Sequence, residues 1–432
     1  MKQPFHGSVE RKFLGVPVNR NIFGWAMYDF ANSAFVTVIV TVVFSRYYQS
    51  SVVADAQLGS ALWGRAVSLS MLLVGLAAPV LGAIADHTRS KKRFMVFFCY
   101  LSVAFTLALW LVRPGDVWLG FGLFVVANFG FNASNVFYNA FLPDITTRER
   151  MGRVSGLGWA LGYVGGLLAL VMALGIVRED VRLVFPAVGG FFGVFATLTF
   201  ILLRENKGEK REHGGGLVYL RVGFLRLRDS FHQIRRLREL VKFLISYLIY
   251  NDGITTVIAF ASIYGGKRFG MELDDLIYYF IIANVSSIVG AFVFGHVLDR
   301  IGARRTITIT LVVWSAVVLW AYFCRSATEY YFVGVLAGIA IGASQSSSRT
   351  MLALLTPDSK MSEFFGFYAF SGKLAAVVGP LVYGEIDRLS SSDRLPILSV
   401  LVFFLAGGLL LQTVKERQGR LAAEGWEELV DS

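Results

Sequence analysis

The sequence predicts an all-α integral membrane protein with twelve transmembrane helices arranged in two bundles of six. Three observations predict it: sparse charge, twelve long apolar runs, and a charged loop that occurs at the same place in both halves. Of the 432 residues, 55% are hydrophobic and only 16% are charged, whereas a soluble domain carries about 25% charged residues. Because so few charges cannot cover a globule of this size, the excess apolar side chains are expected to face lipid. An unusually hydrophobic soluble protein is the alternative, and the length of the charge-free runs disfavours it.

The twelve apolar runs each approach the length of about 20 residues that a helix needs to cross a bilayer. The predicted spans are 24–46, 66–85, 94–112, 117–142, 154–177, 181–203, 240–264, 275–298, 306–323, 330–355, 364–383 and 395–414. Backbone groups inside lipid must bond within their own segment, so each run is predicted to be a helix. The two-residue alternation of a membrane β-barrel is absent from the sequence, which disfavours that class.

The distribution of Lys and Arg predicts the orientation of the spans. Basic clusters follow the second, fourth and eighth spans, at 89–93, 148–153 and 300–305. Cytoplasmic loops are enriched in this way, so both termini are predicted to be cytoplasmic. We expect a monomer in the cell (inner) membrane, in contact with membrane lipids. The net charge of +11 then has a topological cause, and no nucleic-acid partner is expected.

The longest break between spans predicts the domain organisation. Residues 1–203 form an N-terminal bundle, 204–239 a cytoplasmic linker, and 240–432 a C-terminal bundle. In the second part of the linker, apolar residues from Leu217 to Leu237 recur every three or four positions among arginines. This pattern predicts an amphipathic helix on the cytoplasmic membrane surface. A coiled-coil or calmodulin-type partner helix fits the same spacing.

The two halves repeat each other. Gly82 and Asp86 recur as Gly295 and Asp299, 213 residues later. Further pairs at similar offsets are Ala133-Ser134 with Ala343-Ser344, Gly156 with Gly366, Gly162 with Gly372, and Asp29 with Asp252. A near-constant offset across six spans each predicts two parallel structural repeats.

Polar and acidic side chains occur inside the first and seventh predicted spans, at Tyr28, Asp29, Asn32, Asn251 and Asp252. Placing an ionisable group inside a membrane span costs several kcal/mol of free energy, so the group needs a partner or a water-filled cavity. We expect these residues to bind substrate or a cation between the halves. Hydrogen bonds that fix helix packing are the alternative. All five histidines fall in predicted loops or helix ends, so proton coupling would have to use Asp29 and Asp252.

Other polar residues inside the spans extend this predicted cavity. The fourth span carries an amide stripe that includes Asn135 and Asn139, and amides suit a zwitterion or a polyol. Arg349 and Lys373 are predicted either to bind a carboxylate or to neutralise the two acids in one state. For Arg349, snorkelling toward the cytoplasmic interface is the alternative.

Signatures of enzymes are absent from the sequence. It contains no HExxH, GxSxG or Walker motif. The two cysteines are predicted to lie toward opposite membrane faces and suggest no metal site. We therefore expect no catalytic residues, no metal and no cofactor, and any transport must be driven by a gradient.

The repeated loop resembles a known signature. The segment Gly295-x-x-x-Asp299-Arg300-x-Gly302-x-Arg304-Arg305 is similar to the signature loop of major facilitator transporters. The first copy keeps Gly82, Asp86 and Lys91-Lys92-Arg93 but departs from the pattern at His87 and Arg89. The resemblance implies that these loops act in gating. Asp86 would meet the start of the eleventh span near Ser362 and Glu363 and be held by Arg93 or a neighbour, and Asp299 would make the equivalent contact.

A narrower resemblance covers nearly the whole chain. It rests on Gly24-Trp25-Ala-Met-Tyr28-Asp29-Phe-Ala-Asn32-Ser33, Phe137-Tyr138-Asn139-Ala-Phe-Leu-Pro143-Asp144, Val154-Ser-Gly156-Leu-Gly158-Trp159-Ala-Leu-Gly162-Tyr163, Tyr250-Asn251-Asp252-Gly253 and Phe364-Phe365-Gly366-Phe367-Tyr368. These motifs resemble the branch that contains the fungal autophagy-related vacuolar effluxer. The resemblance implies efflux of amino acids.

The sequence thus predicts a major facilitator transporter that moves a small zwitterion, such as an amino acid, by alternating access and with protons. The predicted cavity residues are Tyr28, Asp29, Asn32, Asn135, Tyr138, Asn139, Trp159, Tyr163, Asn251, Asp252, Arg349, Tyr368 and Lys373. Two alternatives stay open. A lipid-like cargo predicts a cavity with a hydrophobic half and a lateral opening. A non-transporting receptor predicts that Asp29 and Asp252 are each satisfied within their own bundle.

Overall fold

The N-terminal half of the chain folds into long, mostly apolar helices. The computed structural model describes residues 11–13, 16–54, 56–177, 180–205, 237–271, 273–389 and 394–426. The long helices of this half are α1 (Arg20–Ala34), which continues through the π-type turns of η1 (Phe35–Val42) into α2 (Val43–Tyr47), then α3 (Ala56–Thr88), α4 (Lys91–Ala108), α5 (Val117–Ala140), α7 (Met151–Val177) and α8 (Val184–Leu202). Short helical turns join them: η2 (Tyr48–Val52), η3 (Leu109–Leu111), α6 (Leu142–Ile145), η4 (Arg148–Arg150) and η5 (Val181–Leu183). Asn19 begins α1, because its side chain accepts a hydrogen bond from the Ile22 N–H.

The C-terminal half repeats this arrangement. Its long helices are α10 (Arg238–Phe269), α11 (Leu273–Ile301), α12 (Ala303–Phe323), α13 (Ala327–Leu355), α14 (Met361–Leu389) and α15 (Leu395–Gln412), with the turn η7 (Asp358–Lys360) and a final short helix α16 (Glu416–Glu424). Left-handed glycines end α10 at Gly270 (φ 63°) and separate α11 from α12 at Gly302 (φ 89°). The predicted amphipathic helix of the linker lies outside the described residues.

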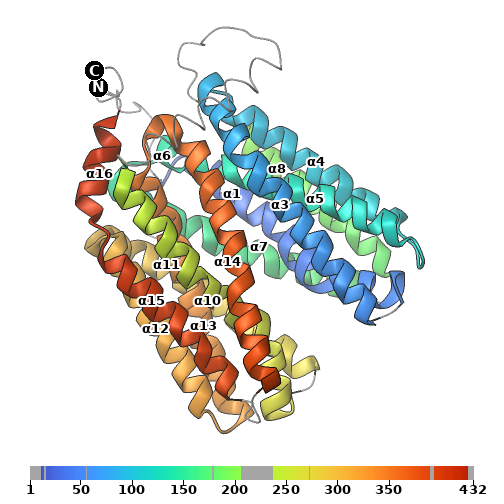
Figure 1. The fold of residues 1–432 in the computed structure, drawn as a ribbon. Coiled ribbons are helices and arrows are strands. Elements are labelled where there is room, and N and C mark those ends of the chain that lie inside the picture. Colours follow the sequence, from blue (N-terminus) through green and yellow to red (C-terminus); the bar gives the residue numbers. More distant parts are fainter. Residues whose placement is uncertain are drawn as a thin grey trace.

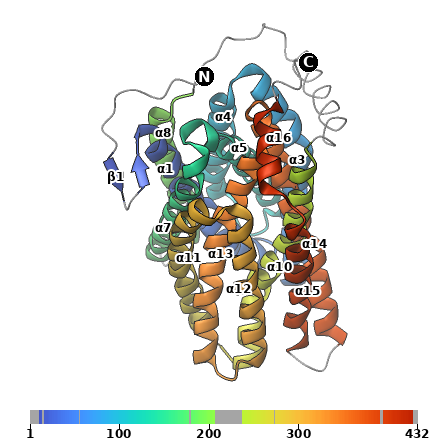
Figure 2. The same ribbon diagram turned by 90° about the vertical axis from the view of Figure 1, so that its left-hand side faces the viewer.

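The long helices follow the order of the predicted spans, but several run further. Helix α3 begins at Ala56 and α10 ends at Phe269, whereas the sequence predicted 66 and 264 for these ends. A helix does not stop where the hydrocarbon stops, because its backbone bonds continue into the interface. A short antiparallel hairpin, β1 (Arg11–Phe13) with β2 (Val16–Val18), precedes α1 and places Arg11 opposite Val18. Figure 2 shows it beside the helices.

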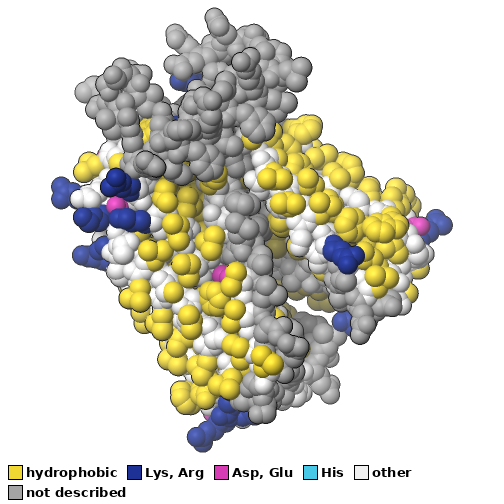
Figure 3. All heavy atoms as spheres, viewed as in Figure 1, with side chains coloured by type: hydrophobic (Ala, Val, Ile, Leu, Met, Phe, Trp, Pro, Cys, Tyr) yellow, Lys and Arg dark blue, Asp and Glu magenta, His cyan; other side chains and the backbone are white. Residues whose placement is uncertain are grey.

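Ten helical segments of the described chain are long and apolar enough to cross a membrane. Large apolar side chains point outward along them, such as Leu76, Val312 and Leu409, which are 66%, 64% and 72% exposed. Figure 3 shows such side chains spread over the outer faces of both halves. In a membrane protein these surfaces face lipid, which is the class that the composition predicts.

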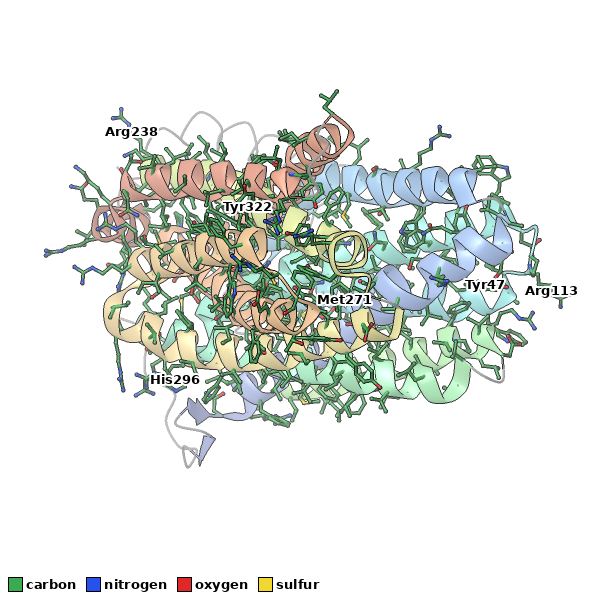
Figure 4. The ribbon with its side chains drawn as sticks, turned by 90° about the horizontal axis from the view of Figure 1, so that it is seen from below. Tyr47, Arg113, Arg238, Met271, His296 and Tyr322 are labelled. Carbon is green, nitrogen blue, oxygen red and sulfur yellow. The ribbon has the colours of Figure 1, made fainter. Side chains whose placement is uncertain are left out.

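The two bundles lie side by side and meet unequally along their length. We call the end that carries the turns around Lys91, Arg148 and Arg304 the basic end. The bundles touch near the basic end and diverge away from it (Figure 1). The contacts between them are made chiefly by α3 with α14 and by α7 with α11. Tyr47 and Arg113 lie at the opposite tip of the N-terminal bundle (Figure 4), where the Tyr47 hydroxyl donates to the Val112 carbonyl at 3.0 Å.

Candidate functional site

An ion pair links the two bundles in the interior of the molecule. The Arg349 Nη1 and Nη2 atoms both donate to Asp29 Oδ2, each at 3.1 Å. The Arg349 side chain is 3% exposed and that of Asp29 is 11% exposed. Asp29 comes from α1 and Arg349 from α13, so the pair crosses the bundle interface. The structure thus places Arg349 in a buried ion pair with Asp29 and not at the cytoplasmic interface.

Three aromatic rings surround the guanidinium of Arg349. Its Cζ atom lies 5.1 Å from the ring centroid of Trp25, 5.7 Å from that of Tyr138 and 4.9 Å from that of Trp159. Cations at such distances are attracted to the faces of aromatic rings. We call Trp25, Tyr138 and Trp159 the aromatic box. All three residues belong to the N-terminal bundle, on α1, α5 and α7.

Helical spacing builds this site. Trp25, Asp29 and Asn32 are spaced at i, i+4 and i+7, so they share one face of α1. Gly158 lets α7 approach that face, because a Cβ there would lie 2.7 Å from Trp25 Cζ3 and 2.8 Å from Asp29 Oδ2. The sequence prediction included Trp159 but left Trp25 out of the cavity. Its position one turn before Asp29 was the signal that would have found it.

Hydrogen bonds between α1 and α5 satisfy part of the predicted amide stripe. Asn32 Nδ2 donates to Asn135 Oδ1 at 3.0 Å, and the Tyr28 hydroxyl donates to Ser134 Oγ at 2.7 Å. The Trp25 indole N–H donates to the Tyr138 carbonyl at 2.9 Å. These bonds fix the helices against each other, which is the packing role that the sequence left open. Asn139 is half-buried on the same helix.

Asp252 does not join the ion pair. Its Oδ2 atom accepts a hydrogen bond from the Gly379 backbone N–H at 2.9 Å, so it binds α14 within its own bundle. Its Oδ1 atom is buried without a hydrogen-bond partner among the described residues. The neighbouring Asn251 donates from Nδ2 to the Gly372 carbonyl at 3.5 Å. The two predicted acids therefore occupy different environments.

The other predicted cavity residues lie on α7 and α14. The rings of Trp159 and Tyr163 are 5.8 Å apart, and the Trp159 indole nitrogen is buried without a partner among the described residues. Tyr368 stacks on Tyr247 at 4.2 Å. Lys373 belongs to α14, but its side chain lies outside the described residues. Asp29, Tyr138, Trp159 and Arg349 are thus brought into direct contact.

At the basic end, Asp299 joins the bundles. Its Oδ1 accepts from the Gly152 N–H at 2.9 Å and its Oδ2 from the Arg153 N–H at 3.3 Å, at the start of α7. Arg153 Nε also lies 2.9 Å from Oδ2, as an ion pair in which this N–H is not directed at the oxygen. A carboxylate is favoured by the unpaired amides of a helix N-terminus. Asp299 belongs to α11, so this contact exists only while the two bundles are together at this end.

Glycines allow the helix backbones to touch beside these contacts. A Cβ at Gly295 would lie 2.6 Å from the Gly152 carbonyl oxygen, and a Cβ at Gly82 would lie 2.6 Å from that of Ser362. The two contacts are related by the internal repeat, because Ser362 follows Gly152 by 210 residues. The same offset relates Gly156 to Gly366. The side chain of Asp86 lies outside the described residues, so its expected contact with Ser362 stays a prediction.

Arg148 adds a second set of contacts across the basic end. Its Nη1 donates to the Leu354 carbonyl at 2.8 Å, and its Nη2 lies 3.6 Å from Asp358 Oδ1. Its Nε lies 3.5 Å from Glu424 Oε1 on α16. A single residue of the N-terminal bundle thus touches α13, the following turn and the final helix.

The remaining predicted gating residues do not cross the interface in the described contacts. Arg304 Nη1 donates to the Val414 carbonyl at 3.1 Å within the C-terminal bundle, and Glu416 accepts from the Ala303 and Arg304 N–H groups next to Gly302. Exposed side chains are found at Arg93, Arg300 and Arg305.

Known proteins are similar to this chain over most of its length. The family model described as "Vacuole effluxer Atg22 like" matches residues 60–424. The MFS-type transporter YxiO of Bacillus subtilis is 29% identical over 409 residues, which cover 91% of this chain and 94% of that protein. Autophagy-related protein 22 of Eremothecium gossypii is 22% identical over 472 residues, covering 94% and 93%.

Solved structures of low sequence identity share the fold. The human organic anion transporter MFSD10 has a TM-score of 0.75 at 15% identity, covering 91% of this chain and 99% of that one. The major facilitator transporter FucP in its outward conformation has a TM-score of 0.67 at 11% identity, covering 91% and 98%. These likenesses show a major facilitator fold.

Proposed function

The chain belongs to the family of Atg22-like vacuole effluxers and is a transporter with the major facilitator fold, and from this premise we propose that its cargo is a small zwitterion such as an amino acid. One observation carries the proposal. Asp29 and Arg349 place one negative and one positive group face to face between the bundles. A zwitterion offers the complementary pair of charges, an ammonium for Asp29 and a carboxylate for Arg349.

We propose that the structure represents the outward-open state of an alternating-access cycle. The positive-inside pattern supports a cytoplasmic basic end, and we place the protein in the cell membrane with both termini inside. Two sets of contacts hold the bundles together at the basic end, those of Asp299 and Arg148. The Arg349 contact holds them together at the centre. Inward opening requires these contacts to break while the two bundles rock around the central site. We take the monomer in its lipid surroundings as the working unit.

We also propose proton coupling through the two buried acids. Asp29 faces the buried guanidinium of Arg349, and Asp252 keeps one buried oxygen without a partner among the described residues. A proton on either acid changes what that acid can bind, since a protonated carboxyl donates one hydrogen bond. Coupling follows if cargo and proton favour the same bundle arrangement.

The Asp29 contact also bears on the receptor alternative. A non-transporting receptor would satisfy each acid within its own bundle, as Asp252 is with Gly379. Asp29 instead pairs with a residue of the other bundle, which supports a site that changes as the bundles move. The surroundings of the pair are aromatic and polar, with Asn32 and Asn135 close by, and this favours a zwitterion over a lipid-like cargo.

Thermal-shift screening of the purified protein tests the proposal. The panel contains neutral amino acids, peptides, sugars and lipids. A ligand that binds the folded state at 100 times its Kd stabilises it by about 2.7 kcal/mol. We expect neutral amino acids to raise the Tm of the wild type and not that of Asp29→Asn. A shift with lipids or sugars alone would overturn the proposed cargo class.

A further inference from the structure

The aromatic box has the form of a cation site that is already filled by the protein's own side chain. We propose that Asp29 and the aromatic box bind the ammonium group of the cargo, and that Arg349 occupies this site as a tethered competitor when no cargo is present. The inference rests on the proposed function, because it names the subsite that takes the cargo's positive end. Its experiments measure equilibrium binding, so they stand apart from any transport assay.

The site is complete without Arg349. Asp29 and the three rings all belong to the N-terminal bundle, whereas Arg349 enters from α13. The Trp25 and Tyr138 rings stack at 4.6 Å with an angle of 15° between them. The Trp25 indole N–H also donates to the Tyr138 carbonyl. These contacts hold Trp25 and Tyr138 in place from within one bundle, so this part of the box is pre-organised for any cation that reaches it.

The contact with Asp29 does not use the two-oxygen fork that distinguishes a guanidinium from an ammonium group. Arginine usually binds a carboxylate as a fork, with two parallel hydrogen bonds to two oxygens. Here both terminal nitrogens of Arg349 donate to the same oxygen, Asp29 Oδ2. The Tyr138 hydroxyl also accepts from Arg349 Nη1, at 3.4 Å. The site therefore presents two acceptor oxygens and three aromatic rings around the cation. An ammonium group can donate to both oxygens, and aromatic cages bind such groups.

Displacement of Arg349 from Asp29 costs free energy, and this cost determines which molecules can bind. A buried guanidinium that loses the carboxylate it is paired with is strongly unfavourable. A simple amine would leave Arg349 in that condition, whereas a zwitterion brings its own carboxylate to the displaced guanidinium. The arrangement thus selects molecules that carry both an ammonium and a carboxylate, and rejects amines of the same size.

Displacement also changes how the bundles are joined. The Asp29–Arg349 pair crosses the interface, while a cargo ammonium in the box would bind the N-terminal bundle alone. Cargo binding therefore replaces a direct contact between the bundles with contacts that pass through the cargo. A ligand shifts a conformational equilibrium only if it binds the two states with different affinities. This exchange of contacts gives the cargo different affinities for the two bundle arrangements.

The first test removes the competitor. Ethylammonium chloride is titrated into purified wild type, Arg349→Gln and the exposed control Arg325→Gln, and quenching of tryptophan fluorescence is measured. Two of the 8 tryptophans, Trp25 and Trp159, lie in the box. We expect Arg349→Gln to bind ethylammonium at least about tenfold more tightly than wild type. In wild type Arg349 occupies most of the sites, and the apparent affinity falls in proportion to the fraction of sites that are free. Arg325→Gln should match wild type, and Asp29→Asn added to Arg349→Gln should abolish the gain.

The second test uses the wild-type protein, so it does not depend on the folding of a variant. Ethylammonium is titrated in sodium acetate and in sodium chloride at equal ionic strength. Acetate can pair with displaced Arg349, so we expect acetate to lower the apparent Kd of ethylammonium, and ethylammonium to lower that of acetate by the same factor. Equal ethylammonium affinity in both salts, or no gain in folded Arg349→Gln, would overturn the inference. If these gains appear but no zwitterion is transported, the cation site stands and the proposed function fails.

Discussion

Asp29 and Asp252, the acids of the first and seventh spans, do not occupy equivalent positions in the two bundles. The Tyr28 hydroxyl bonds Ser134 at 2.7 Å, and the Tyr250 hydroxyl bonds Ser348 at the same distance. These matching pairs make Asn251, not Asp252, the counterpart of Asp29. One residue turns a side chain by about 100° around a helix. This rotation directs Asp252 to Gly379 of its own bundle.

The difference predicts that the same substitution destabilises the protein by unequal amounts at the two positions. Asp29→Asn leaves Arg349 buried without its carboxylate and should cost about 3–5 kcal/mol. Asp252→Asn keeps an amide oxygen that can accept from Gly379 and should cost about 1 kcal/mol or less. Thermal unfolding in detergent measures both. The double variant Asp29→Asn with Arg349→Gln should recover part of the first loss, and an Asp252→Asn loss as large as that of Asp29→Asn would contradict the assignment.

Proton coupling predicts a second effect of these acids. In proteoliposomes, cargo uptake driven by a pH gradient should fall to the level without a gradient in at least one of Asp29→Asn and Asp252→Asn. Exchange of labelled for unlabelled cargo without a gradient serves as the control for a working site. Should both variants keep full gradient-driven uptake, protons are not carried by these acids.

The fold was largely predictable from the sequence because hydropathy, basic loops and glycine spacing are local signals. The register of the two halves was harder to predict. Pro143 and Pro357 are 214 residues apart, while Gly156 and Gly366 are 210 apart, so the loop between them is four residues shorter in the second half. Offsets that drift in this way cannot align single residues, and this is why the two acids were paired.

The sequence singled out most residues of the candidate site but not their contacts. Asp29, Tyr138, Trp159 and Arg349 were all expected in the cavity. Nothing in the sequence indicates that Arg349 enters a box of the other bundle, since that contact depends on how the two bundles meet. The hairpin before α1 was not foreseen either, because strand pairs of three residues carry too few alternating positions to be read.

Close packing of α7 on α11 predicts a test of the closed basic end. A Cβ at Gly156 would collide with the Ala291 carbonyl oxygen, whereas a Cβ at Gly175 of the same helix would meet nothing within 4 Å. Gly156→Ala should therefore hold the basic end open, while Gly175→Ala should be neutral or slightly stabilising.

Maleimide labelling of a cysteine at Ser346, in a background without Cys99 and Cys324, measures this opening, since Ser346 is fully buried in the closed interface. Faster labelling is expected for Gly156→Ala alone. Equal labelling rates in the two variants would show that this contact does not govern closure.

Asp299 predicts an unequal contribution of the two charged loops. Its carboxylate binds the start of α7 and Arg153, whereas the first copy of the loop departs from the pattern at His87 and Arg89. Asp299→Asn weakens charge-assisted hydrogen bonds worth about 1.5–3 kcal/mol, so transport should fall more than in Asp86→Asn. Initial rates of cargo exchange give the comparison, and equal losses would count against two unequal latches.

The central claim is that a zwitterion is held between Asp29 and Arg349, and cargo exchange tests it most directly. Proteoliposomes loaded with a neutral amino acid are diluted into the labelled compound, with wild type, Arg349→Gln and the control Arg325→Gln. We predict accumulation of label by wild type and Arg325→Gln, and none above empty liposomes for Arg349→Gln. Full exchange by Arg349→Gln, or no exchange of any neutral amino acid by wild type, would contradict the account.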